Sequence, residues 1–117
     1  MRVDVLHNLN PEALQRGFDQ TDPLIHVQQF DIEPDHDHET LTHVLWLTTV
    51  GHRGDATSGR PDEQASAYRA DGHRPLQVGD VVVIDNRVWA CARHGWTLLT
   101  TGAPTLPVTT QQGDRLG

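Results

Sequence analysis

The chain has 117 residues, with sixteen acidic side chains, nine arginines, no lysine and a formal net charge of −7. This length predicts one domain, and the negative charge makes nucleic acid an unlikely partner, because nucleic-acid binding depends on cations that neutralise phosphates. No apolar run approaches the ~20 residues of a membrane-spanning helix, and the N-terminus lacks the apolar stretch of a signal peptide. We therefore expect a cytoplasmic protein without a membrane partner, and its single cysteine agrees with a reducing compartment.

The first segment alternates apolar and polar side chains. Val3 and Val5 lie on one side of an extended chain, which is the period-2 pattern of a half-buried strand. Asn10 is a good N-cap and Pro11 suits the first helical position, so a short helix should follow and end near Gly17.

Residues 24–32 favour a second strand. Ile25 and Val27 are in phase with each other but out of phase with Phe30, so a β-bulge is expected near Gln28–Gln29. A bulge of this kind returns the apolar side chains to one face.

The next segment, Glu-Pro-Asp-His-Asp-His-Glu at 33–39, is dense in groups that can bind metals. One interpretation is a metal site built from His36, His38 and His43. The other is a solvated segment whose acids lie favourably at a helix N-terminus. We favour the second, because zinc ligands normally have tighter spacings, and we expect no metal or cofactor.

Residues 40–50 form the best helical pattern of the chain. Leu41, Val44, Leu45 and Thr48 mark one face of it. Such an apolar helix should be mostly covered, and we expect it to pack on the sheet.

Residues 51–75 are polar and rich in glycine and proline, with one short helical piece expected from Pro61 to Tyr68. Connections of this length are usually functional or disordered. We therefore expect a binding surface here.

Residues 76–99 organise the fold. Four β-branched residues at 81–84 precede Asp85-Asn86, a pair that suits a tight hairpin turn. A two-residue turn would place Val83 opposite Val88 and Val82 opposite Trp89. The segment therefore predicts a three-stranded antiparallel meander, with strands at 80–84, 87–92 and 96–99.

Together these elements predict an α+β fold. It is a small single domain at 1–101, with an antiparallel sheet that includes the C-terminal meander and one main helix packed on it. Residues 102–117 have no apolar period and predict a disordered tail.

Catalytic chemistry has weak support in the sequence. Cys91 and His94 could act as nucleophile and base, but strand residues three apart point to opposite faces and no third orienting group follows. Cys91 is better explained as a small buried apolar residue. We therefore expect a protein that is not an enzyme.

The segment from Tyr68 to Val82, followed by Trp89-Ala-Cys-Ala-Arg-His-Gly-Trp96, resembles the YodL-like domain family. Members typically have Arg-Ser-Leu-Ser-Val-Gly-Asp-Val-Val, then an aromatic residue, a cysteine and a glycine followed by an aromatic residue. This chain has Pro75 and Gln77 where the family usually has serines. The resemblance implies a small α+β domain from an actinobacterial phage or plasmid, without known catalytic residues.

Two functions follow from the sequence. The first is a non-catalytic protein-binding module that modulates or inhibits a host protein. Its candidate contact residues are Tyr68, Arg69, His73, Arg74, Arg93, His94 and Trp96, since aromatic residues and arginine are typical interface anchors. The alternative is a small-molecule or nucleotide-binding domain, or an enzyme, that uses the 51–75 connection and Arg74.

Overall fold

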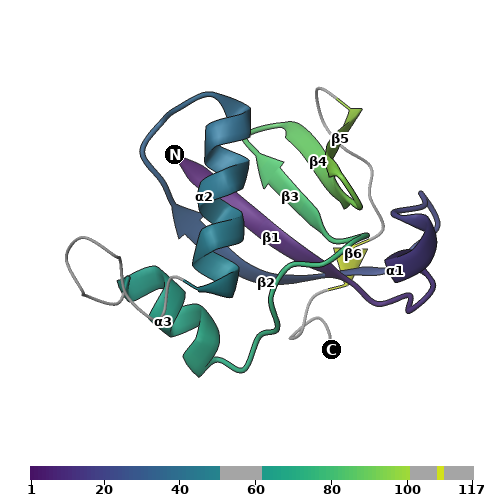
Figure 1. Cartoon of the computed structure of the whole chain (residues 1–117), viewed down its shortest axis with the longest axis horizontal. Coiled ribbons are helices and arrows are strands. Elements are labelled where there is room, and N and C mark those ends of the chain that lie inside the picture. The colour runs from purple at the N-terminus through teal and green to yellow at the C-terminus, as the bar shows by residue number, and fades with distance from the viewer. Residues whose placement is uncertain (51–61, 101–107, 110–117) are drawn as a thin grey trace. The chain divides into compact units, whose positions relative to one another are not determined.

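The computed structural model describes residues 1–50, 62–100 and 108–109 (Figure 1). In chain order the elements are β1 (Arg2–Asn8), α1 (Ala13–Arg16), β2 (Leu24–Asp31), α2 (Asp37–Thr49), α3 (Glu63–Ala70), β3 (Val81–Ile84), β4 (Arg87–Ala92), β5 (Gly95–Thr100) and β6 (Val108–Thr109). This mixture of helices and a mainly antiparallel sheet confirms the α+β class.

Contacts within the chain divide it into two units. The sheet unit comprises residues 1–31 and 77–117, and the helical unit comprises residues 32–76. The prediction of a single domain at 1–101 is not tested by this division and stays a prediction.

The sheet unit is one six-stranded sheet with the order β5-β4-β3-β1-β2-β6. Every neighbouring pair is antiparallel except β2 with β6. Because β1 pairs with both β2 and β3, the N-terminal strand joins the first hairpin to the C-terminal meander (Figure 1).

The meander prediction is confirmed in strand order and register. Val83 lies opposite Val88 and Val82 lies opposite Trp89. Asp85 adopts a positive φ of 55°, which the tight turn between β3 and β4 requires.

The predicted bulge in β2 is present, one residue earlier than expected. Val5 pairs with Gln28 and Leu6 pairs with His26, so Val27 has no partner on β1. The extra residue brings Ile25 and Phe30 to the same face, since Ile25 pairs with His7 and Phe30 pairs with Val3.

The tail prediction is wrong at two residues. Val108–Thr109 forms β6, which pairs in parallel with β2 at Leu24 and Ile25. A short strand can add there because β2 otherwise ends the sheet and offers unpaired backbone groups. The rest of the predicted tail lies outside the described residues.

Both faces of the sheet carry buried apolar side chains. Leu6, Leu24, Val81 and Val88 form one cluster, with Phe18, Val83 and Leu99 packed against it. The opposite face carries five fully buried side chains, Val3, Val5, Phe30, Val82 and Ile84. The strands are therefore apolar on both sides, as the run of valines at 81–83 indicates.

In the helical unit, α2 begins three residues before the predicted start. Leu41, Val44 and Thr48 are buried as expected, whereas Leu45 is 38% exposed. The packing of this helix on the sheet stays a prediction. The expected short helix is confirmed as α3, and Asp62 caps it by accepting a hydrogen bond from the backbone N–H of Ala65.

Candidate functional site

The β4–β5 hairpin places apolar side chains at the surface of the sheet unit. Its two-residue turn, Arg93-His94, is closed by the pair Ala92 and Gly95, and Gly95 has a positive φ of 97°. A side chain at that φ would be strained, so glycine suits the position.

Cross-strand pairing in this hairpin brings four side chains to one face. Trp89 lies opposite Leu98, and Cys91 lies opposite Trp96. Residues directly opposite in an antiparallel pair share a face, as do residues two apart on one strand. We name these four side chains, Trp89, Cys91, Trp96 and Leu98, the hairpin patch.

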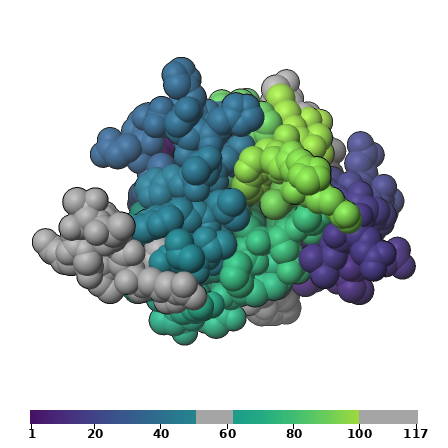
Figure 2. Space-filling view, viewed as in Figure 1, coloured from purple at the N-terminus to yellow at the C-terminus, as the bar shows by residue number. Residues whose placement is uncertain are grey.

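The hairpin patch is only partly covered. Leu98 is 43% exposed, and the other three side chains are partly exposed. Figure 2 shows the yellow-green residues of the hairpin at the surface of the visible face. A single exposed leucine is ordinary on a protein surface, whereas a cluster of partly exposed aromatic and aliphatic side chains is typical of a contact surface.

The helix α1 lies beside the turn of this hairpin. The Arg93 guanidinium donates a hydrogen bond to the backbone carbonyl of Gln15 over 3.4 Å. Leu14, which precedes Gln15 in the chain, is 46% exposed.

Three of the predicted contact residues belong to this hairpin. Arg93 and His94 are exposed at its turn, and Trp96 is a member of the hairpin patch. Residue type predicted these three contacts, but it did not predict Leu98. The missing signal was the pairing of Leu98 with Trp89, which fixes the face that Leu98 occupies.

The other four predicted contact residues belong to the helical unit. Arg69 is exposed, and His73 and Arg74 are partly exposed. Tyr68 is a correction, because its side chain is only 1% exposed and its hydroxyl donates a hydrogen bond to the carbonyl of Arg74 over 2.5 Å. Its ring also lies 5.1 Å from that of His73. A buried, hydrogen-bonded tyrosine offers a partner no surface, so Tyr68 stabilises the helical unit.

The thiol of Cys91 is poorly suited to nucleophilic chemistry. Burial raises its pKa, and the nearby charge of Asp80 acts in the same direction. A raised pKa reduces the thiolate fraction at neutral pH, and the thiolate is the nucleophile. The partly exposed Cys91 thus acts as an apolar member of the hairpin patch.

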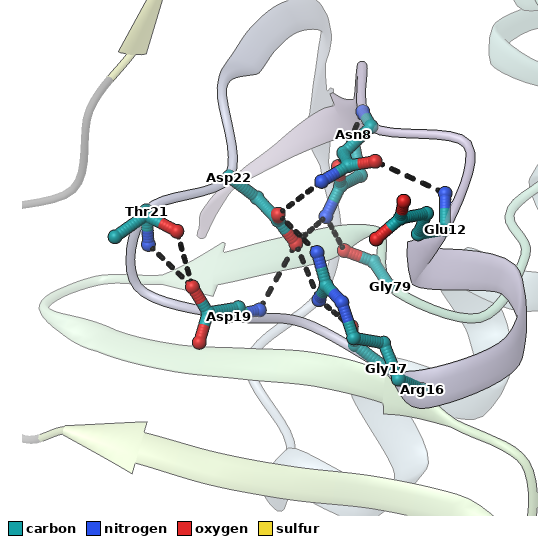
Figure 3. A network of polar contacts seen from close by, with 9 residues as sticks. Asn8, Glu12, Arg16, Gly17, Asp19, Thr21, Asp22 and Gly79 are labelled. Carbon is teal, nitrogen blue, oxygen red and sulfur yellow. Dashed lines mark hydrogen bonds and ion pairs between the residues drawn. The ribbon is translucent and has the colours of Figure 1, made fainter.

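A second concentration of functional groups lies where α1 meets β2. Asp22 is fully buried and accepts hydrogen bonds from five groups (Figure 3): Nδ2 of Asn8, Nδ2 of Asn10, both terminal nitrogens of Arg16 and the backbone N–H of Asp19. The shortest contact joins Arg16 to Asp22 Oδ1 over 2.6 Å. We name these residues, Asn8, Asn10, Arg16, Asp19 and Asp22, the polar clasp.

Electrostatics in the polar clasp follow from these hydrogen bonds. The Arg16 guanidinium holds the pKa of Asp22 far below its usual range, and the amides of Asn8 and Asn10 act in the same direction against the effect of burial. The same contact raises the pKa of Arg16. Asp22 is therefore ionised at neutral pH.

The polar clasp also connects α1 to the start of β3. The side chain of Asn8 donates to the carbonyl of Gly79, and its backbone N–H donates to Oδ1 of Asp80 over 2.8 Å. Oδ2 of Asp80 accepts the N–H of Gln77, so each carboxylate oxygen of Asp80 accepts a backbone N–H. Because the acceptors of Asp22 are already used, the polar clasp is structural rather than a ligand site.

The acidic and histidine-rich segment at 33–39 leads into α2, and the expectation of no metal stays a prediction. Asp37 and Glu39 lie in the first turn of α2, where negative charge stabilises a helix N-terminus. Within residues 1–50, 62–100 and 108–109, no three histidine, cysteine or acidic side chains are grouped to hold a metal ion.

No family model, curated protein or solved structure matches the chain. The likeness to the YodL-like family therefore stays a prediction. None of the helices in the described part of the chain has the length and apolar character needed to cross a bilayer.

Proposed function

We propose that this chain is a non-catalytic protein-binding module whose main contact surface is the hairpin patch with the adjoining turn. The observation that carries the proposal is the grouping of two tryptophans, a cysteine and a leucine on one partly exposed face. Large aromatic side chains provide most of the energy in many interfaces, and Trp96 and Trp89 are the anchors here.

Charge determines what kind of partner suits this surface. Residues 87–100 contain two arginines and no acidic residue, whereas the whole chain carries −7. The contact surface itself is apolar, but the rest of the chain is acidic. A partner with basic residues around its own contact surface is therefore favoured, because complementary charge speeds association. Arg93 and His94 would then contact acceptors at the edge of the interface.

The resemblance to the YodL-like family supplies a biological context for the proposal. A small protein carried by a phage or plasmid would modulate or inhibit a protein of its bacterial host. The predicted contacts Arg69, His73 and Arg74 belong to the same proposal as secondary contacts in the helical unit.

The test is affinity capture from a host lysate with the tagged full chain and two variants. Leu98→Asp places a charge in the hairpin patch and should reduce recovery of the captured protein at least about tenfold, the effect of losing a hot-spot contact. Glu12→Ala removes an exposed acid that belongs to neither the hairpin patch nor the polar clasp, and it should capture the same protein as the wild type.

Both variants should have wild-type circular dichroism, because residues 12 and 98 are exposed. Capture that is unchanged by Leu98→Asp would remove the hairpin patch from the proposal. Turnover of a small substrate that depends on Arg74 would instead support the alternative function.

A further inference from the structure

The strand β5 is an edge of the sheet. Among the described residues, β5 pairs with β4 on one side and no strand pairs with it on the other. An edge strand presents unpaired backbone N–H and C=O groups that can pair with another strand.

The sequence of β5 lacks the usual protection against such pairing. Its residues, Gly-Trp-Thr-Leu-Leu-Thr, include neither a charged side chain nor a proline. Proteins commonly use edge charges, prolines or bulges to block pairing. The one protective feature is a bulge at Leu99, since Trp89 pairs with Leu98 and Val88 with Thr100. The regular part of the edge is therefore residues 95–98.

The turn geometry decides which backbone groups point outward. In a two-residue hairpin the closing pair, Ala92 and Gly95, is hydrogen-bonded, and hydrogen-bonded pairs then alternate along the strand. Gly95 and Thr97 thus direct their backbone groups toward β4. Trp96 and Leu98 direct theirs toward the open edge.

A second copy of this chain fits that edge in one register. Antiparallel pairing about a two-fold axis must place outward-pointing residues opposite each other, so the axis passes through residue 96, 97 or 98. An axis at residue 96 would place Leu98 opposite the turn, and an axis at residue 98 would require the bulged Leu99 to pair. Only an axis at Thr97 keeps the pairing within residues 96–98, where Trp96 lies opposite Leu98.

In this register the side chains at the interface are complementary. Trp96 of one copy lies opposite Leu98 of the other, and the same pair recurs on the other side of the axis. Pairs of an aromatic and an aliphatic side chain stabilise antiparallel strands. The two hydroxyl side chains of Thr97 face each other on the opposite face of the sheet.

Charge does not oppose the pairing at short range. No acidic residue occurs between positions 87 and 100. The two copies of Arg93 would lie at opposite ends, roughly 27 Å apart at about 3.4 Å per residue, which is well beyond the screening length of about 8 Å. The acids that produce the net charge of −7 act only at longer range, so salt should favour association.

We infer that the chain forms a symmetric dimer by antiparallel pairing of β5 with β5 of a second copy, centred on Thr97. The two-fold axis is perpendicular to the sheet, so the hairpin patches of both copies lie on the same face and become one larger surface. The use of this larger surface for binding rests on the proposed function, whereas the dimer itself does not.

The test uses the full chain with substitutions at Thr97, because its side chain is exposed and points away from the hairpin patch. Thr97→Lys and Thr97→Glu each place like charges opposite each other at the axis and should raise the dimer dissociation constant at least about fivefold. Thr97→Val keeps a neutral β-branched side chain and should dimerise like the wild type. An equimolar mixture of the lysine and glutamate variants should restore the dimer, because opposite charges then face each other.

Light scattering and sedimentation from about 5 µM to about 500 µM measure these states, a range suited to a small interface. The wild type should approach twice the 13.0 kDa of the chain as concentration rises. Amide exchange should slow at Trp96 and Leu98 under the same conditions. A wild type that stays monomeric throughout overturns the dimer, even if it captures a host protein.

Two further results also overturn the inference. Charged variants that dimerise as well as the wild type would place the interface elsewhere. Folded charged variants that are monomeric alone and remain so when mixed would exclude the axis at Thr97. Loss of host-protein capture by Leu98→Asp together with a monomeric wild type would retain the proposed function alone.

Discussion

The polar clasp and the hairpin patch belong to the same unit, yet they use polar and apolar side chains in opposite ways. In the polar clasp a carboxylate is fully buried and accepts five hydrogen bonds. In the hairpin patch a leucine is 43% exposed beside two partly exposed tryptophans. The hydrogen-bond acceptors of Asp22 in the polar clasp are thus all used, whereas the hairpin patch has apolar surface exposed to solvent.

This difference shows that a concentration of ionisable groups is weak evidence for a functional site. Buried polar groups must be hydrogen-bonded, and a carboxylate with all its acceptors used has none to offer a ligand. The exposed apolar atoms of Leu98 have no hydrogen-bonding requirement of this kind.

The largest expected effect is the loss of Asp22. Asp22→Ala leaves Asn8, Asn10 and Arg16 without their common acceptor and should destabilise the protein by about 3 kcal/mol. Urea unfolding followed by circular dichroism measures the change. Glu12→Ala is the matched control from the same segment and should be near neutral; equal losses in both variants would contradict a structural role specific to the polar clasp.

A smaller loss is expected at Gly79, where α1 packs closely against the start of β3. A Cβ at Gly79 would lie 2.5 Å from Cβ of Ala13, at a φ of +97°. Gly95 has the same φ of +97° and nothing within 4 Å of its Cβ position. Gly79→Ala should therefore be less stable than Gly95→Ala by roughly 1–3 kcal/mol, the cost of overpacking. Similar unfolding midpoints for the two variants would show that α1 can move away from residue 79 without loss of stability.

The pH dependence of stability should follow Asp22. Its pKa is lowered in the folded protein, so the folded state binds fewer protons than the unfolded state as the pH falls through about 4, the ordinary pKa of aspartate. The stabilisation is thus present above about pH 4 and is lost at lower pH. Asp22→Asn should be less stable at pH 7 and should lose less stability than the wild type between pH 5 and pH 2, as measured by urea unfolding. If Asp22→Asn loses as much stability as the wild type between pH 5 and pH 2, the pH dependence arises from other carboxylates.

The smallest effect concerns Cys91, the single thiol of the chain. Because burial raises its pKa, its alkylation at pH 7.5 should be several-fold slower than that of a free cysteine with a pKa of about 8.5. Iodoacetamide labelling followed by mass spectrometry measures the rate. Labelling as fast as that of free cysteine would show that the hairpin patch does not shield the thiol.

Local patterns predicted much of the fold. The β-branched run at 81–84 with the Asp85-Asn86 turn predicted β3, β4 and their register, and the phase change in β2 placed its bulge within one residue. The pairing of β1 with β3 could not be predicted, because it joins segments more than seventy residues apart and no local pattern encodes it.

The candidate site was only half predictable for the same reason. Arg93, His94 and Trp96 stand out by residue type, whereas Leu98 becomes part of the hairpin patch only through its pairing with Trp89. Tyr68 was assigned to the surface by residue type, but packing in the helical unit buries it. Asparagine and aspartate are frequent in turns. The sequence therefore gave no sign that Asn8, Asn10 and Asp19 all donate hydrogen bonds to Asp22.

Site-specific photo-crosslinking compares the two regions most directly. A photoreactive phenylalanine analogue at position 98, in the hairpin patch, and another at position 12, beside the polar clasp, would be incorporated into the full chain. Both positions are exposed. Irradiation of each protein, pure and in host lysate, should give crosslinks to protein from position 98 and none above background from position 12. Crosslinks from position 12 with none from position 98 would contradict the assignment of binding to the hairpin.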